Sequence, residues 1–212
     1  MAAPGLRTKL ATGRFFAVPG SQDMIAAAVA NCAGFDVVYG TGYWLTASAL
    51  GLPNAGLATH TQMHDRMATL ARSSNAALIA DAGTGYDGHL NVHHTVKRYE
   101  AAGVAAIPLE DQGFPKKCGH TPFKRVIPAS DMADKIKVAV DAREDMLVIA
   151  RTDADQSEGL DGVLRRLDAY ARAGADIFFP EAHTSTEEMA KACAVFDQPV
   201  MAQMTNGGLT AI

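Results

Sequence analysis

The sequence predicts an α/β protein of the (β/α)8 barrel type, and three regularities support this fold class. Short apolar runs alternate with segments of helical periodicity, several of these segments end on the same Ala-Gly pair, and polar residues recur just after the apolar runs. Strands that alternate with helices form parallel sheets, because each helix returns the chain to start the next strand in the same direction.

Seven runs rich in branched and other apolar residues are expected to form strands that are buried on both faces. They are Phe15–Val18, Phe35–Tyr39, Ala76–Ala80, Val104–Leu109, Met146–Ala150, Asp176–Phe179 and Pro199–Ala202. A closed barrel of this type has eight strands. We therefore expect residues 1–212 to form a single barrel domain whose eighth unit is missing or supplied from elsewhere.

Between these runs, apolar residues recur three and four positions apart, as in Asp131–Val140 and Leu160–Arg172. This is the spacing of an amphipathic helix. Three helices are expected to end just before a strand, at Ala33–Gly34, Ala102–Gly103 and Ala173–Gly174. Glycine closes a helix cheaply because it adopts the left-handed conformation, so the recurring pair predicts a repeated βα unit.

Polar residues stand at the carboxyl ends of the predicted strands. They are Thr41, Asp81, Glu110, Asp111, Arg151, Asp153, Glu181, Gln203 and Thr205. In a parallel barrel these ends meet on one rim, where the loops build the active site. A doubly wound open sheet also binds ligands at its strand ends, but it brings fewer strands to one point, so the barrel is preferred.

The composition is that of an ordinary globular protein, with 48% hydrophobic and 20% charged residues. Nineteen Lys and Arg stand against 23 Asp and Glu, and this net charge of -4 argues against nucleic acid or an anionic membrane as a partner. No apolar run has the length of a membrane span or of a signal peptide core. Three widely spaced cysteines fit neither a disulfide framework nor a zinc site, so a cytoplasmic protein is expected.

Three charged residues of the predicted rim indicate what the site could bind. They are Asp81, Glu110 and Arg151. Magnesium takes one or two protein carboxylates and keeps several waters, which suits Asp81 and Glu110. An arginine binds a carboxylate through two hydrogen bonds, so Arg151 could bind a carboxylate of an anionic substrate. The alternatives are a turn or N-cap role for Asp81 and a structural ion pair between Glu110 and Arg151. Since both signs of charge meet on one rim, a metal with an anionic substrate is preferred.

Cys118 lies in a loop after the fourth strand, between two lysines and a Gly-His pair, with Pro115 and Pro122 on either side. Positive neighbours lower the pKa of a thiol and make it useful in acid–base chemistry near neutral pH. An idle surface thiol is the alternative. Cys32 and Cys193 are expected on apolar helix faces, as core residues.

The pentapeptide Lys116–His120 resembles the cysteine-bearing lyase branch of the isocitrate lyase and phosphoenolpyruvate mutase superfamily, the branch of 2-methylisocitrate lyase. The resemblance continues along nearly the whole chain. It includes Tyr39–Gly42, Leu50–Pro53, the Asp81 loop, Glu110–Gln112, Ala150–Ala154, Glu158–Asp161 and Phe179–Ala182. It implies a (β/α)8 barrel, a homotetramer with a C-terminal helix exchanged between subunits, and a small anionic carboxylate as substrate.

By motif, the resemblance also implies a role for each site residue. Asp81 would bind Mg2+, with Mn2+ as an alternative, and Glu110 would act through metal-bound water. The catalytic residues would be Cys118, Tyr39 and Arg151. The substrate-binding residues would be Thr41, Gly42, Tyr43, Gly119, His120, Arg151, Glu181, Gln203 and Thr205.

The implied reaction breaks a carbon–carbon bond of a small 2-hydroxy di- or tricarboxylate, similar to 2-methylisocitrate, and gives a 2-oxo acid and a carboxylate. Cys118 would protonate the carbanionic carbon, and Tyr39 would interact with the hydroxyl proton. Two carboxylates of the family's metal motif are replaced here by Asn54 and Gly83, which predicts weaker magnesium binding. Three hypotheses stay open: this lyase, another reaction on the same scaffold such as oxaloacetate hydrolysis or phosphonate chemistry, and a non-catalytic relative.

Overall fold

The computed structural model describes residues 5–119, 121–182 and 185–204 of the chain. Six strands form one sheet, and each strand is parallel to the one that precedes it in the sequence. The strands are β1 (Gly20–Ser21), β2 (Val37–Gly40), β3 (Ala77–Ala80), β4 (Ala106–Glu110), β5 (Leu147–Thr152) and β6 (Ile177–Pro180). A doubly wound sheet reverses its strand order at one point. The unbroken order from β1 to β6 is that of a barrel wall, which confirms the predicted fold class.

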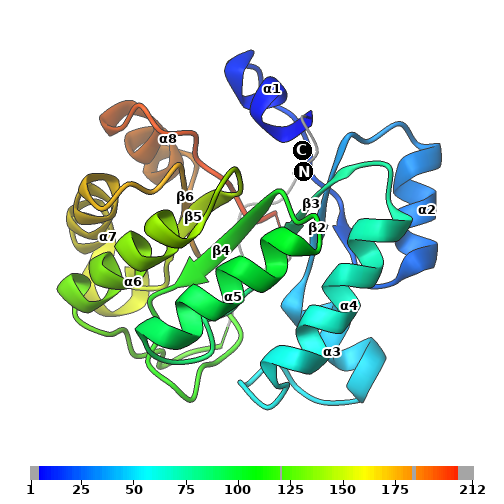
Figure 1. Ribbon diagram of the computed structural model, residues 1–212. Coiled ribbons are helices and arrows are strands. Elements are labelled where there is room, and N and C mark those ends of the chain that lie inside the picture. The colour runs from blue at the N-terminus through cyan, green and yellow to red at the C-terminus, as the bar shows by residue number, and fades with distance from the viewer. Residues whose placement is uncertain (1–4, 120, 183–184, 205–212) are drawn as a thin grey trace.

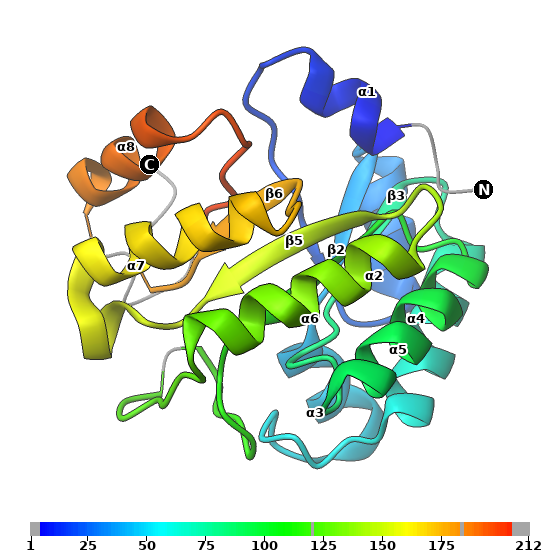
Figure 2. The ribbon, with the colours of Figure 1, turned by 60° about the vertical axis from the view of Figure 1, so that its left-hand side comes forward.

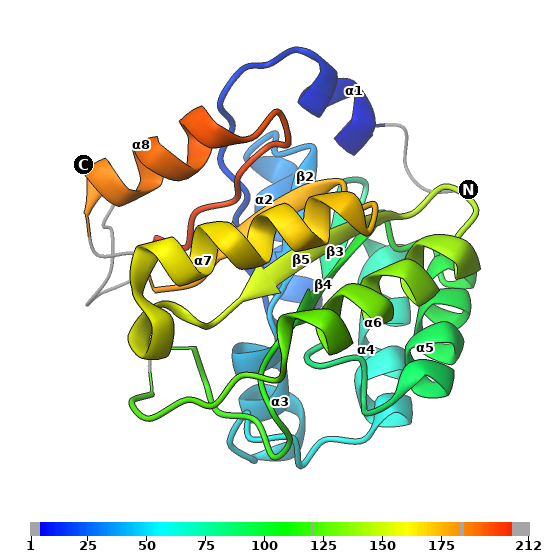
Figure 3. The ribbon, with the colours of Figure 1, turned by 90° about the vertical axis from the view of Figure 1, so that its left-hand side faces the viewer.

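Helices cover the outside of this wall (Figure 1). In the described part of the chain the helices are α1 (Gly5–Ala11), α2 (Met24–Cys32), α3 (Gly42–Leu50), α4 (His60–Ser73), α5 (His89–Ala101), α6 (Ala129–Ala142), α7 (Asp155–Arg172) and α8 (Thr186–Val195), and α1 lies at one end of the wall (Figure 1). Figures 2 and 3 show α5, α6 and α7 running side by side on the outer face. α1 lies at the opposite end of the barrel wall from α3 (Figure 1).

The strands are buried on both faces because alternate residues enter two different cores. Val38, Leu78 and Val148 belong to the large core between the sheet and the helices. Their neighbours along the strands, among them Ile79 and Ile149, belong to a second core inside the barrel wall, which Leu6 of α1 joins. Because both faces of each strand are buried, the strand sequences are continuous apolar runs without polar residues at alternate positions.

The first and last predicted strands differ from the structure. Phe15–Val18 is irregular, and Phe15 is 95% exposed. The ladder with β2 begins only at the carbonyl of Pro19, which accepts a hydrogen bond from Tyr39, because proline has no N–H to donate. At the other end, the run Pro199–Ala202 pairs with β6 through one parallel bridge, between Val200 and Phe178. This run therefore takes the seventh position in the wall.

The predicted helix ends are confirmed. The helices α2, α5 and α7 end at Ala33, Ala102 and Ala173 as C-caps. The glycine after each cap has a positive φ, 81° at Gly34, 88° at Gly103 and 96° at Gly174. The sequence predicted these three junctions because only glycine adopts this conformation without strain.

Two further expectations concern the surface. Cys32 and Cys193 are exposed, so the prediction that they are core residues was wrong: the buried residues of their helices are Ala27 and Ala30 in α2 and Ala192 in α8. Within the described residues, no helix combines the length and the apolar character that crossing a membrane requires.

Candidate functional site

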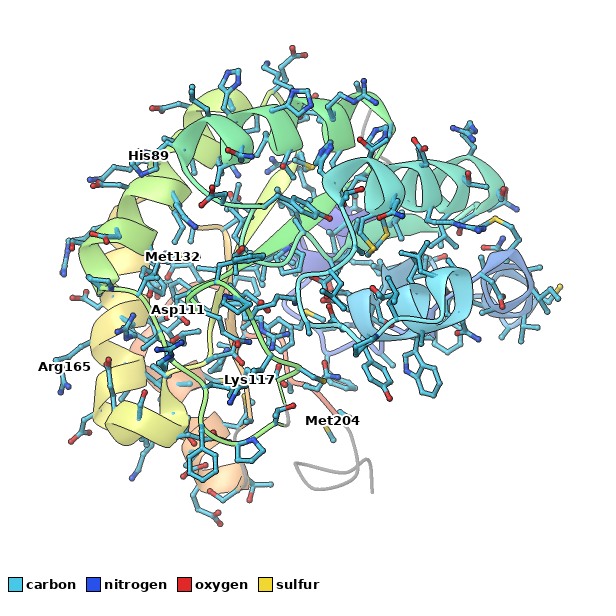
Figure 4. The ribbon with its side chains drawn as sticks, turned by 90° about the horizontal axis from the view of Figure 1, so that it is seen from below. His89, Asp111, Lys117, Met132, Arg165 and Met204 are labelled. Carbon is cyan, nitrogen blue, oxygen red and sulfur yellow. The ribbon has the colours of Figure 1, made fainter. Side chains whose placement is uncertain are left out.

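The polar residues that follow the strands gather at one end of the barrel wall, on the side where α3 and the loop 111–127 lie. Viewed from this end, Asp111 and Lys117 lie inward of Arg165 (Figure 4). The charged side chains of this rim come from the ends of β3, β4, β5 and β6. They are partly or fully buried, so each needs a counter-charge or hydrogen bonds to be stable there.

Asp81 follows β3 and is held by two backbone N–H groups. Gly42 donates to its Oδ2 at 3.1 Å and Gly83 donates to its Oδ1 at 2.8 Å. A side chain at position 42 would collide with the Asp81 carboxylate, which explains the glycine at the start of α3. Each of these bonds uses one acceptor position, and a carboxylate oxygen accepts about two hydrogen bonds.

Arg151 is the centre of the charge network on the rim. Its Nε lies 2.9 Å from Asp153 Oδ2 and 3.4 Å from Glu110 Oε2, and its Nη1 lies 3.6 Å from Glu181 Oε2. The guanidinium also stacks over the ring of Phe179, 5.1 Å from its centroid. The structural ion pair between Glu110 and Arg151, which the sequence left as an alternative, is therefore present.

Burial is the main influence on Glu110 and Asp153. It raises the pKa of Glu110, and the charges of Lys116 and Arg151 oppose this. Burial acts in the same direction on Asp153, but Arg151 and Lys124 outweigh it and lower the pKa of Asp153 to about 2. Asp153 is therefore a permanent negative charge between two cations.

The loop that carries Cys118 is fixed at its base. Gln112 pairs with Val126 in an antiparallel bridge, and the Gln112 side chain accepts from Lys117 N and donates to Lys117 O, both at 2.9 Å. The ammonium of Lys116 is buried and lies 3.0 Å from Glu110 Oε1. The ammonium of Lys117 donates to the carbonyls of Pro122 and Phe123. Both lysines beside the cysteine thus have definite partners.

Gly119 brings this loop into contact with the rim. A Cβ atom at Gly119 would overlap the Glu181 carboxylate and would lie 2.7 Å from Arg151 Nη2. The backbone therefore touches the Arg151–Glu181 pair directly. Cys118, the next residue, is a free and half-buried thiol.

A small cavity of about 50 Å³ adjoins Asp81. Asn54, Gly83, Lys116 and Phe114 are among its lining residues. The two positions at which the sequence departs from the family's metal motif, Asn54 and Gly83, thus meet beside Asp81. A Cβ at Gly83 would lie 3.6 Å from Lys116 Nζ, so the ammonium occupies the space next to this glycine.

Tyr39 lies inside the barrel wall, at the base of the site. Burial raises its pKa well above the ordinary value, and the charge of Asp81 adds to this effect. The phenol therefore keeps its proton near neutral pH. It is suited to donate a hydrogen bond and poorly suited to accept a proton.

Asp111, beside Glu110, has a structural role. It is fully buried and accepts hydrogen bonds from Thr152 Oγ1 at 2.7 Å, Tyr170 Oη at 2.8 Å and Asp153 N at 2.9 Å. Arg166 of α7 lies 3.2 Å away as its counter-charge. These contacts fix the end of β4 against β5 and α7, and so they fix the neighbouring Glu110 and Asp153.

The predicted substrate-binding residues are distributed around this network. Thr41 caps α3 by accepting from Trp44 N, and Tyr43 is half-exposed with its ring against that of Trp44. Gln203 is half-buried in the segment after Val200. His120 and Thr205 lie outside the described residues. The assignments to substrate binding stay predictions.

Lys124 is a site residue that the sequence analysis did not name, and Lys116 was named there only as part of the Cys118 loop. Lys124 Nζ donates to Gly119 O at 2.6 Å and lies 2.7 Å from Asp153 Oδ1. It stands on no predicted strand end, so position in the fold gave no signal for it. Two lysines that are almost fully buried in a short loop are unusual, but burial cannot be read from one sequence.

Comparison with known proteins agrees with this geometry. The family model of phosphoenolpyruvate phosphomutase matches residues 6–211. A 2,3-dimethylmalate lyase of Eubacterium barkeri is 42% identical over 212 residues, covering 99% of this chain and 73% of that protein. A 2-methylisocitrate lyase of Halalkalibacterium halodurans is 40% identical over 195 residues, 92% of this chain and 65% of that protein. The chain thus spans about two thirds to three quarters of these relatives.

Solved structures give the same result. A 2,3-dimethylmalate lyase, described as a PEP mutase/isocitrate lyase superfamily member, superposes with a TM-score of 0.92 at 36% identity, over 98% of this chain and 71% of that chain. An oxaloacetate acetylhydrolase with an inhibitor gives 0.88 at 36% identity, over 92% and 68%. A phosphonopyruvate hydrolase with oxalate and Mg2+ gives 0.83 at 32% identity, over 92% and 69%. The chain belongs to the PEP mutase/isocitrate lyase superfamily, whose members include the lyases named above.

Proposed function

We propose that the chain forms the catalytic barrel of a magnesium-dependent carbon–carbon lyase, which cleaves a small 2-hydroxy di- or tricarboxylate to a 2-oxo acid and a carboxylate. The contact of Gly119 with Arg151 and Glu181 carries the proposal. It brings the residue next to Cys118 against the guanidinium that is suited to bind a substrate carboxylate, which supports a role for the thiol close to that group. This cleavage requires an acid that protonates the carbanionic carbon and a cation that binds the substrate carboxylate, and the two must lie close together.

The charges at the rim support a metal ion in the working site. Four carboxylates stand against three cations: Asp81, Glu110, Asp153 and Glu181 against Lys116, Lys124 and Arg151. A dicarboxylate substrate would add two negative charges to this excess. A divalent cation beside Asp81 would offset the two charges that the substrate adds, and the oxygen donors present there suit magnesium.

The protein supplies few metal ligands. Within residues 5–119, 121–182 and 185–204, no three His, Cys, Asp or Glu side chains converge as a ligand set. We infer that Asp81 would bind Mg2+ or Mn2+ directly, that Glu110 would act through water, and that substrate oxygens would complete the shell. The bound ion would stabilise negative charge that develops on the substrate.

The residues of the chain would divide the remaining work. Arg151 would bind and orient a substrate carboxylate. Tyr39 would donate a hydrogen bond to a substrate oxygen rather than take the hydroxyl proton, because its pKa is raised well above the ordinary value. Cys118 would donate its thiol proton to the carbon from which the other half departs. The loop 111–127 would exclude water from the reacting atoms.

The relatives' names suggest which substrates to test first. They point to 2-methylisocitrate and 2,3-dimethylmalate. A second candidate is hydrolysis of oxaloacetate, favoured by the structural match to an oxaloacetate acetylhydrolase. The homotetramer with exchanged helices and the cytoplasmic location stay predictions from the resemblance.

The test is to incubate the purified chain with Mg2+ and a panel of these acids, and to follow release of 2-oxo acids, oxalate and acetate. Release of a 2-oxo acid from a 2-hydroxy acid supports the lyase, and oxalate from oxaloacetate supports the second candidate. If no acid gives a product and calorimetry shows no Mg2+ binding, the lyase and hydrolase hypotheses are wrong. The hypothesis of a non-catalytic relative is then supported.

Cys118→Ser tests the role of the thiol. A hydroxyl is a much weaker acid than a thiol, so kcat should fall by about 100-fold or more, as for loss of a general acid. Oxalate binding should be retained, because serine is nearly the same size. Turnover at the wild-type rate would remove Cys118 from the chemistry.

A further inference from the structure

Lys124 is a buried lysine in the loop that carries Cys118. Its side chain is 1% exposed, and its ammonium has two partners, Gly119 O at 2.6 Å and Asp153 Oδ1 at 2.7 Å. Burying an ammonium is costly unless its hydrogen bonds and charge are satisfied. Here one partner belongs to the loop and the other to the rim, so the side chain links the two.

The rim partner, Asp153, is itself firmly held. Its backbone N–H donates to Asp111 Oδ1 at 2.9 Å, and its Oδ2 lies 2.9 Å from Arg151 Nε. Its Oδ1 accepts from Arg151 Nη2 at 3.1 Å and also from Lys124. Asp153 is thus one anion shared by the guanidinium that faces the substrate and the ammonium that faces the loop.

The loop partner, Gly119, lies at the point of closest approach. Its backbone touches Arg151 and Glu181 on one side, while its carbonyl is bonded to Lys124 on the other. The position of Gly119 over the rim, and with it that of the neighbouring Cys118, therefore depends on the Lys124–Asp153 link. Lys117 and Gln112 also hold this loop, but they bind other atoms of the loop or its base.

We propose that Lys124 is a positioning residue that couples binding of an anionic substrate at Arg151 to the position of the Cys118 loop over the rim. In the structure Asp153 neutralises the charge of the Arg151 guanidinium. A substrate carboxylate bound to Arg151 would take over part of this interaction. Asp153 then interacts more strongly with Lys124, and Lys124 holds Gly119 and Cys118 more firmly over the substrate. The inference rests on the proposed role of Arg151 as the substrate-binding cation.

Accessibility of the Cys118 thiol gives a measurement that needs no turnover. The chain is treated with iodoacetamide, with and without oxalate and Mg2+, and alkylation of each cysteine is followed by mass spectrometry of its peptide. In the wild type, oxalate should slow alkylation of Cys118. In Lys124→Met, alkylation without oxalate should be about tenfold faster, as for loss of a charge-assisted hydrogen bond, and oxalate should give little protection.

Matched variants separate positioning from damage to the fold. Lys124→Arg keeps the charge and should restore part of the protection, whereas Lys124→Gln should behave like Lys124→Met. Lys137→Met removes an exposed lysine of α6 that pairs with Asp134, outside the rim, and should match the wild type. Cys32 and Cys193 are exposed in the described structure and serve as internal controls. The alkylation rate of each should be the same in the wild type and in every folded variant.

Two results would overturn the proposal: wild-type alkylation and protection of Cys118 in both neutral variants, or full oxalate protection in Lys124→Met. If Lys124→Met does not fold, Lys124→Gln and Lys124→Arg decide the question by the same measurement. Failure of the proposed lyase would appear separately, as absence of turnover in the wild type. For an active enzyme, Lys124→Met should lower kcat more than it raises KM.

Discussion

Gly119 is the residue at which the loop and the rim meet most closely, so it offers a sharp test of the site. In Gly119→Ala the new methyl group would overlap Glu181 and crowd Arg151. Either the loop or the ion pair must move, and we expect oxalate binding to weaken at least tenfold in calorimetry, with turnover falling in parallel.

Gly113 provides the control within the same loop. A Cβ there would meet only the Arg125 carbonyl, at the ordinary contact distance of 3.7 Å. Gly113→Ala should therefore bind oxalate as the wild type does. Equal binding by both alanine variants would show that the Gly119 contact has no part in the site.

His60 makes a prediction about pH. It lies against His94 and His64, with ring centroids 5.1 and 5.8 Å away. Burial lowers its pKa to about 4, and His94, His64 and Arg98 contribute in the same direction, while Asp65 opposes them. The unfolded chain binds this proton near pH 6.5, the ordinary value, so between pH 6.5 and 4 the unfolded state holds more protons than the folded state.

The free energy of unfolding should therefore fall as the pH drops through this window, by roughly 1 kcal/mol after allowance for the partial exposure of His60. Urea unfolding at pH 7.5 and pH 5 measures the change, and His60→Phe should reduce it. An unchanged difference between the two pH values in His60→Phe would place the titrating group elsewhere.

At the scale of elements, Arg166 connects α7 to the sheet. It lies 3.2 Å from the buried Asp111 carboxylate and 2.6 Å from Glu158 Oε1, its two ionic partners. Arg166→Leu would leave Asp111 without its counter-charge, and we expect a loss of about 3 kcal/mol in the free energy of unfolding. Urea denaturation checks this value.

Arg165, the adjacent residue, is the matched control because it is exposed and points away from the core (Figure 4). Arg165→Leu should change stability by less than about 0.5 kcal/mol. A loss below about 1 kcal/mol in Arg166→Leu would show that Tyr170, Thr152 and the backbone satisfy Asp111 without the arginine.

The elements could be predicted where one local cause determined the conformation. Gly34, Gly103 and Gly174 end helices because their positive φ suits glycine. Phe15–Val18 failed as a strand because strand formation there depends on pairing with β2, which Pro19 delays to Gly20. An apolar run alone does not contain that information.

The site was predictable only in part, for a similar reason. Asp81, Glu110, Arg151 and Glu181 stand at strand ends, so the repeat of the fold places them together. Lys124 reaches Asp153 from 29 residues away, through a loop whose path follows no periodic pattern. Such contacts depend on tertiary structure, and a single sequence gives no signal for them.

At the scale of the whole molecule, the strict strand order has a consequence for how the protein folds during synthesis. Each strand pairs with the strand made just before it, and no strand of the described part waits for a distant partner. Neighbouring units can therefore join as they leave the ribosome, since early contacts close short loops and lose less chain entropy. The nascent barrel wall would grow in one direction, from β1 towards β6.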